Sequence, residues 1–149
     1  MCVTGELWPV SDVLAFLTGS WRVDRTVRDL AADATGTFTG TTAFTPREDG
    51  GLLHVESGTF TWHKVTRPAE RTLHYLPGEE PGTAEVRFAD GRFFHGLDLR
   101  TGRHIADHPC SADLYRGEFE VADAGCWRTA WRVKGPAKDL LLTTEYRRA

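Results

Sequence analysis

The sequence is poor in cysteine, in long apolar runs and in an excess of either charge, and each shortage excludes a class of protein. Three cysteines with no C-x-x-C spacing do not describe a disulfide framework or a zinc ribbon. No run approaches the roughly 18 apolar residues of a membrane span. The net charge is −3 and no basic patch stands out, so neither a membrane nor a nucleic acid is expected as a partner.

The first residues, MCVTGELWPVSDV, also lack the basic region and the apolar core of a secretory signal. The simplest expectation is a cytoplasmic protein with reduced cysteines. Arginine outnumbers lysine fifteen to three, which favours a bacterium with a GC-rich genome as the source.

What the sequence does contain is enough apolar material for a packed core. Of its 149 residues, 40% are hydrophobic and 11% are aromatic, which is too many for a disordered chain. A chain of this length usually forms one domain. We expect residues 1–149 to fold as one domain without help from a disulfide or a metal.

One segment has helical periodicity, and the rest of the chain has the periodicity of strands. Residues 9–18 place apolar side chains at helical spacing. After Gly19, apolar and polar residues alternate, with turn signals every ~8–12 residues. We expect about ten strands, at roughly 20–28, 36–45, 51–58, 59–66, 71–76, 83–89, 92–100, 103–110, 113–122 and 126–134, with a last one at 139–148. The predicted fold is all-β: a closed up-and-down antiparallel barrel plugged at one end by the short helix.

Two glycine-containing turns predict the register of the strands around them. A two-residue turn at Asp90-Gly91 places Phe93 and His95 on the inward face. If Thr101-Gly102 is a second two-residue turn, His108 lies directly opposite His95.

A third turn, Asp123-Ala124-Gly125, agrees on the same inward face because it aligns Gly117 with Trp131. A small residue opposite a large one is sensible packing. The candidate lining of a ligand cavity is the apolar and aromatic part of this face: Phe93, Leu97, Trp127, Trp131 and Tyr146.

His95, His108, Tyr115 and Asp113 are the candidate catalytic residues. Directly opposed side chains have Cβ atoms ~4.5–5.5 Å apart, so the two histidines could share a proton or a ligand group. Tyr115 faces His108 if the intervening turn is tight, whereas a bulge at Pro109 would leave Asp113 as the nearer partner. Histidine exchanges a proton near neutral pH, and a tyrosine can donate to a developing oxyanion. A purely structural histidine pair is the competing interpretation.

Glu56 is a further ligand-binding candidate with two possible orientations. The face of its strand that carries Leu53 and Val55 is the more apolar, which predicts that Glu56 and His54 are exposed. A bulge would reverse the faces and make Glu56 a buried carboxylate with a raised pKa. The other histidines are expected at the surface or the rim: His63, His74 and His104.

No metal or cofactor is expected. His95, His108 and Asp113 could form a set of two histidines and one carboxylate, but their spacing matches no known ligand pattern. The sequence also has no phosphate-binding glycine loop, no G-x-S-x-G elbow and no supported cysteine nucleophile.

Gly19-Ser20-Trp21, between the helix and the first strand, resembles the G-x-W signature of the calycins, the superfamily of the lipocalins. The resemblance implies that the tryptophan packs at the closed end of the barrel beneath an arginine of the last strand, here Arg148 or Arg147. Among calycins the nitrobindin-like barrels are the most similar. Their haem is not carried over, because no histidine follows His108. FFHGLDL, HPCSADLYRGEF and the final EYRR are similar to an uncharacterised bacterial family of unknown function.

Together these features predict a small-molecule-binding barrel. Its catalytic version would be a cofactor-independent isomerase, cyclase or dehydratase of bacterial specialised metabolism, moving a proton between histidine and tyrosine. The alternatives are a non-catalytic carrier or sensor of an apolar ligand, and an interaction module whose barrel is filled with side chains. The chain is expected to be a monomer or a homodimer.

Overall fold

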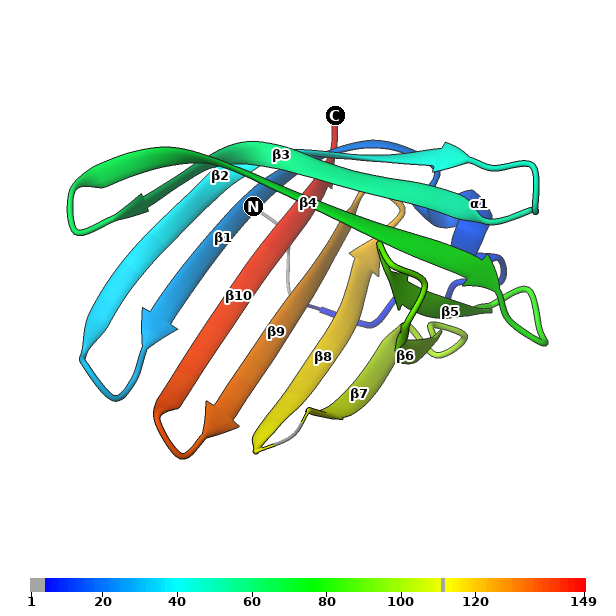
Figure 1. Cartoon of the computed structure of the whole chain (residues 1–149). Helices are drawn as coiled ribbons and strands as arrows, with labels where there is room; N and C mark the ends of the chain where they lie inside the picture. The colour runs from blue at the N-terminus through cyan, green and yellow to red at the C-terminus, as the bar shows by residue number, and fades with distance from the viewer. Residues whose placement is uncertain (1–4, 111) are drawn as a thin grey trace.

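The computed structural model describes residues 5–110 and 112–149. Ten antiparallel strands form one sheet in the order β6-β5-β4-β3-β2-β1-β10-β9-β8-β7, which curls into a nearly closed barrel (Figure 1). Apart from β1 and β10, paired neighbours are consecutive in the chain, so the predicted meander is confirmed. The elements are α1 (Val13–Leu17), β1 (Gly19–Asp29), β2 (Ala34–Pro46), β3 (Leu52–Trp62), β4 (Val65–Pro77), β5 (Thr83–Phe88), β6 (Phe93–Asp98), β7 (Arg103–Cys110), β8 (Asp113–Asp123), β9 (Cys126–Gly135) and β10 (Lys138–Arg148).

β3 and β4 are longer than the sequence predicts. A strand end was expected near residues 58–59, but the chain continues to His63-Lys64, where both residues have positive φ (49° and 65°) and form the turn. Gly58 lies inside β3, opposite Gly40 of β2. A Cβ on Gly58 would lie 2.2 Å from a backbone oxygen of β2, so this glycine serves close strand approach and not a turn.

The helix covers one end of the barrel, as predicted, but it is shorter than residues 9–18. Asp12 caps it by accepting a hydrogen bond from the Ala15 N–H at 3.1 Å. The residues before the cap are held extended because the Val10 N–H donates to the Leu99 carbonyl at 3.0 Å. The helix therefore begins only at Val13, and it buries one face against the strands.

The expected arginine–tryptophan contact at the closed end is confirmed, with Arg148 as the arginine. Trp21 is fully buried, and its indole N–H donates to the Leu17 carbonyl at 2.8 Å. The Arg148 guanidinium lies 3.8 Å from the centre of the Trp21 ring and donates to the Phe16 and Thr18 carbonyls. One cation thus covers the tryptophan and caps the end of the helix.

The predicted pairing of β6 with β7 is wrong: these strands are the two ends of the sheet, and no ladder joins their described residues. Thr101-Gly102 is not a two-residue hairpin turn. The Leu99 N–H instead donates to the Gly82 carbonyl, and the Asp98 N–H donates to His104 Nδ1 at 3.3 Å. Between the described residues of β6 and β7 the barrel is therefore closed without a strand ladder, by side-chain packing and by the hydrogen bond between Asp98 and His104.

Two observations bear on the expected location of the protein. Cys126 is buried and disulfide-bonded, which counts against the expectation that every cysteine is reduced. Within the described part of the chain, no helix has the length and apolar character needed to cross a membrane. A cytoplasmic location stays a prediction.

Candidate functional site

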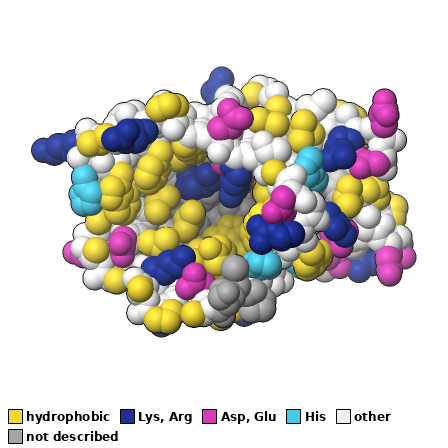
Figure 2. All heavy atoms as spheres, viewed as in Figure 1, with side chains coloured by type: hydrophobic (Ala, Val, Ile, Leu, Met, Phe, Trp, Pro, Cys, Tyr) yellow, Lys and Arg dark blue, Asp and Glu magenta, His cyan; other side chains and the backbone are white. Residues whose placement is uncertain are grey.

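A cavity of about 100 Å³ lies inside the barrel. β5 pairs only with Leu73–Pro77 of β4, so the first half of β4 is a free edge that tolerates Pro68. Figure 2 shows the molecule hollowed in this view, with hydrophobic side chains around the hollow and Lys or Arg side chains deep inside it. The cavity is lined by residues of six strands: Arg25, Arg71, Phe94, Tyr115, Thr129, Trp131, Val133, Leu142, Thr144 and Tyr146.

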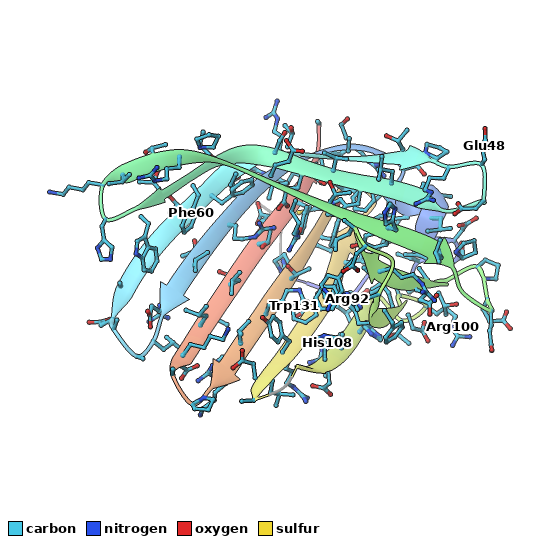
Figure 3. The ribbon with its side chains drawn as sticks, in the orientation of Figure 1. Glu48, Phe60, Arg92, Arg100, His108 and Trp131 are labelled. Atoms are coloured by element: carbon cyan, nitrogen blue, oxygen red, sulfur yellow. The ribbon has the colours of Figure 1, made fainter. Side chains whose placement is uncertain are left out.

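Aromatic side chains form one wall of the cavity. The Trp131 ring stacks on Phe94, with centroids 5.2 Å apart and planes 24° apart. Trp131 lies opposite Gly117, as predicted, and a Cβ on this glycine would come within 2.5 Å of the indole. The absence of a side chain at Gly117 therefore sets the position of Trp131. Trp131 of β9 and His108 of β7 are labelled in Figure 3.

Phe94, and not Phe93, faces the cavity, which corrects the sequence prediction. The ladder between β5 and β6 shifts between Val86 and Arg87, so Arg87 rather than Phe88 lies opposite Phe93. This irregularity in the ladder reverses the orientation of the first residues of β6. Phe93 is 52% exposed as a result.

The other wall carries a buried ion pair between Arg25 and Glu56. The guanidinium donates two hydrogen bonds to the carboxylate, each 2.8 Å long. It also donates to Thr144 Oγ1 at 2.8 Å and to the Tyr146 hydroxyl at 3.2 Å. All the polar atoms of this group are thereby satisfied inside the barrel, which a buried ion pair requires.

The burial of Glu56 and His54 corrects the expectation that both are exposed. Each is only 2% exposed, and no bulge interrupts the ladders of β3 with β2 and β4. Leu53 and Val55 point outward instead, because Arg25 compensates the charge of Glu56 and Phe44 stacks on the His54 ring. The inward face is thus selected by partners that are distant in sequence.

The charge of Glu56 survives burial. Burial alone would raise the pKa of this carboxyl, but the hydrogen bonds from Arg25 and the nearby charge of Arg71 lower it below its ordinary value. Burial also disfavours the Arg25 cation, yet Tyr146 and Glu56 raise its pKa. The expected raised pKa of a buried Glu56 is therefore wrong, and both groups are ionised at neutral pH.

Arg71 brings a second cation to the same cavity from β4. Its guanidinium lies 3.7 Å from the Glu56 carboxylate, beyond hydrogen-bond distance, and its side chain is 46% exposed. Sequence reasoning missed both arginines. Alternation from the buried Trp21 and Val23 would have placed Arg25 inward, and alternation from Leu73 would have done the same for Arg71.

The four candidate catalytic residues are not brought together as one group. Tyr115 lies opposite His108 as predicted, with ring centroids 6.0 Å apart, and Tyr115 lines the cavity. The Phe94 ring packs against both histidine rings: its centroid is 4.7 Å from that of His95 and 5.2 Å from that of His108. Asp113 is held by Lys138 at 2.9 Å.

His95 has the environment of a structural histidine. It is 3% exposed, and its Nδ1 atom bonds to the Gly96 carbonyl at 2.7 Å. Burial lowers the pKa of His95 to about 4, so the ring is neutral in the folded protein.

The remaining lining candidates divide between cavity and core. Tyr146 and Trp131 line the cavity, whereas Leu97 and Trp127 are buried in the apolar core. Trp127 stacks on Tyr146 with centroids 3.8 Å apart, so it supports the lining from behind. Among the described residues, no group of three His, Cys, Asp or Glu side chains is arranged to hold a metal ion.

Comparison of the sequence with family models assigns the chain. The model of DUF6314, a family of unknown function, matches residues 17–148, and the chain belongs to this family. No curated protein matches the sequence.

Solved structures share the fold at low sequence identity. The S-type phycobiliprotein lyase CPES from Guillardia theta superposes with a TM-score of 0.71, at 11% identity over 95% of this chain and 93% of that one. EF1p2_mFAP2b bound to DFHBI gives a TM-score of 0.52, at 17% identity over 93% and 98%. A DUF3598 protein of unknown function from Nostoc punctiforme gives 0.51, at 10% identity over 97% of this chain and 51% of that one. The likeness extends to the fold alone.

Proposed function

We propose that the protein binds one small, flat aromatic molecule in the barrel interior. The observation that carries the proposal is the cavity of about 100 Å³ walled by Trp131, Phe94 and Tyr115. An engineered cavity of about 150 Å³ holds a benzene molecule. A cavity somewhat smaller than this, open to the outside, has room for one ring with the rest of the molecule in its mouth.

Two further observations support this function over an interaction module with a filled barrel. Much of the barrel is filled by aromatic core residues, but the space beside Trp131 is left open although a larger side chain than Leu142 could close it. The fold is also shared with EF1p2_mFAP2b, whose structure contains the small molecule DFHBI. The Arg148–Trp21 contact supports the related inference that this family is a branch of the calycins.

The test uses trans-cinnamamide, a neutral single-ring probe, and isothermal titration calorimetry. We expect saturable binding that Trp131→Ala weakens about tenfold, because aromatic contacts contribute ~0.5–1.5 kcal/mol beyond area burial. Trp8→Ala is the matched control: Trp8 is 47% exposed and lies outside the cavity. Leu142→Phe keeps the aromatic wall but fills the cavity, so this variant should abolish binding. Equal effects of Trp131→Ala and Trp8→Ala, or no binding to the wild type, would contradict the proposal.

Proton transfer is the second candidate function, supported by the pairing of His108 with Tyr115 beside the cavity. In this version Tyr115 donates to a ligand oxygen and His108 exchanges the proton, while His95 and Asp113 hold the surrounding strands in place. Phenylacetone in D₂O probes the idea, because base catalysis exchanges its α-protons and NMR follows the loss. Exchange should slow in Tyr115→Phe and His108→Phe. Exchange rates equal to those of the wild type would leave binding as the function.

A further inference from the structure

The charges inside the barrel do not balance. Among the described residues that line the cavity, only Arg25 and Arg71 are charged, and Glu56 is the one described carboxylate that contacts them. Glu56 directs both oxygens at Arg25, at 2.8 Å each, so the carboxylate is already used by one of the two cations. The described lining of the cavity therefore carries one positive charge without a counter-charge of its own, on the half-exposed Arg71.

The nearby titratable groups do not alter this balance. His54 is packed between Phe44 and Tyr75, and burial lowers its pKa to about 3, so it is neutral at pH 7. His95 is neutral for the same reason. Burial raises the pKa of Tyr75, which keeps that hydroxyl protonated. None of these groups supplies the missing negative charge.

Arg71 is the cation with free hydrogen-bonding capacity. Within the described part of the chain its one charged partner is Glu56, at 3.7 Å, whereas Arg25 donates hydrogen bonds to Glu56, Thr144 and Tyr146. A guanidinium offers five N–H donors in a planar fork that matches a carboxylate. Because Arg71 is near the aromatic wall of the same cavity, a molecule in contact with Trp131 can bring a carboxylate to it.

We propose that the ligand is an aromatic carboxylate, whose carboxylate binds Arg71 beside the Arg25–Glu56 pair while its ring packs against Trp131. This inference rests on the proposed binding function and adds the charge of the ligand to it. An apolar wall strengthens such an ion pair, because the low local dielectric reduces screening by water. The second cation then has a reason to face a cavity with an aromatic wall.

The test compares trans-cinnamate with trans-cinnamamide, which has the same shape and no charge. At low ionic strength, calorimetry should give an affinity for cinnamate about tenfold or more above that for cinnamamide, because hydrogen bonds to charged groups are the strong ones. Arg71→Met should reduce this ratio to near one and leave the cinnamamide affinity within about twofold. Arg71→Lys should retain part of the preference.

Arg116→Met is the matched control, because Arg116 is an exposed arginine of β8 that pairs with Asp107 and does not line the cavity. It should leave the ratio unchanged. Cinnamamide binding as tightly as cinnamate, or an Arg71→Met variant that keeps the preference, overturns the inference and leaves the binding function intact. Failure of both compounds to bind overturns the proposed function as well. Thermal unfolding of each variant checks that the fold is retained.

Discussion

Replacing Glu56 by glutamine should destabilise the protein strongly, because it leaves a buried cation without its counter-charge. The Glu56 side chain is 3% exposed and that of Arg25 is 11% exposed, and two 2.8 Å hydrogen bonds join them. Arg25 cannot escape by losing its proton, since its pKa is raised. Removing one partner of a buried pair costs about 3–5 kcal/mol. Because glutamine can still accept one hydrogen bond, we expect the lower end of this range.

Urea unfolding followed by tryptophan fluorescence at pH 7 measures the effect. The double variant Arg25→Met with Glu56→Leu is the informative companion, because it removes both charges and leaves neither unpaired. The double variant should lose less unfolding free energy than the sum of the losses in Arg25→Met alone and Glu56→Leu alone, by at least ~1.5 kcal/mol. A cost below ~1 kcal/mol for Glu56→Gln, or additive single effects, would refute the reasoning that the pair is buried and coupled.

The same pair also predicts an effect of acid. The folded-state pKa of Glu56 lies below its ordinary value of 4.5. The stability from its ionised form is therefore present above pH ~4.5 and is lost as the pH falls through the lowered pKa. Glu56→Gln should lack this loss. Unfolding curves between pH 5 and pH 3 for both proteins check it, and parallel slopes would contradict the assignment.

Three further perturbations test other parts of the structure. Arg148→Met should cost about 1–3 kcal/mol, since it removes a cation over Trp21 and two hydrogen bonds to carbonyls; urea unfolding measures it, and an unchanged midpoint would count against the contact. Gly117→Ala should cost about 1–3 kcal/mol and shift the fluorescence of Trp131, because its Cβ would lie 2.5 Å from the indole; a silent substitution would mean that the glycine is not required. Burial lowers the pKa of His95 to about 4. The contribution of neutral His95 to the unfolding free energy is therefore complete above pH ~6.5 and falls by up to ~1.4 kcal/mol per pH unit down to pH ~4. His95→Phe should remove that slope from unfolding curves measured against pH, and an unchanged profile would contradict the burial of the ring.

The meander and the closed end could be predicted from the sequence because both depend on local signals. Alternation and turn residues define most strands, and the loop ending at Gly125 sets the register that pairs Gly117 with Trp131. The cation over Trp21 follows from the G-x-W signature, which pairs the tryptophan with an arginine of the last strand, here Arg148. In these cases the deciding residues are neighbours in sequence or belong to one recognisable pattern.

The orientation of the site residues depended on contacts that alternation alone does not contain. Phe93 and Phe94 exchange faces because of one irregularity in the β5–β6 ladder, and such a shift leaves no clear mark in an apolar run. The strand of Glu56 has apolar residues on both faces, so the inward face is decided by Arg25, 31 residues away in the chain. The burial of a charged side chain can be predicted from sequence only when the residue that compensates its charge is predicted as well.

The most direct test of the central claim locates a bound ligand inside the barrel. Nitrogen-15-labelled protein is titrated with trans-cinnamamide while NMR follows the indole N–H signals of the tryptophans. We predict a saturable shift of the Trp131 signal, with no change in the signal of Trp8, which is exposed and does not line the cavity. A shift confined to Trp8, or no shift of Trp131 at saturating probe, would contradict a ligand site between the strands of this barrel.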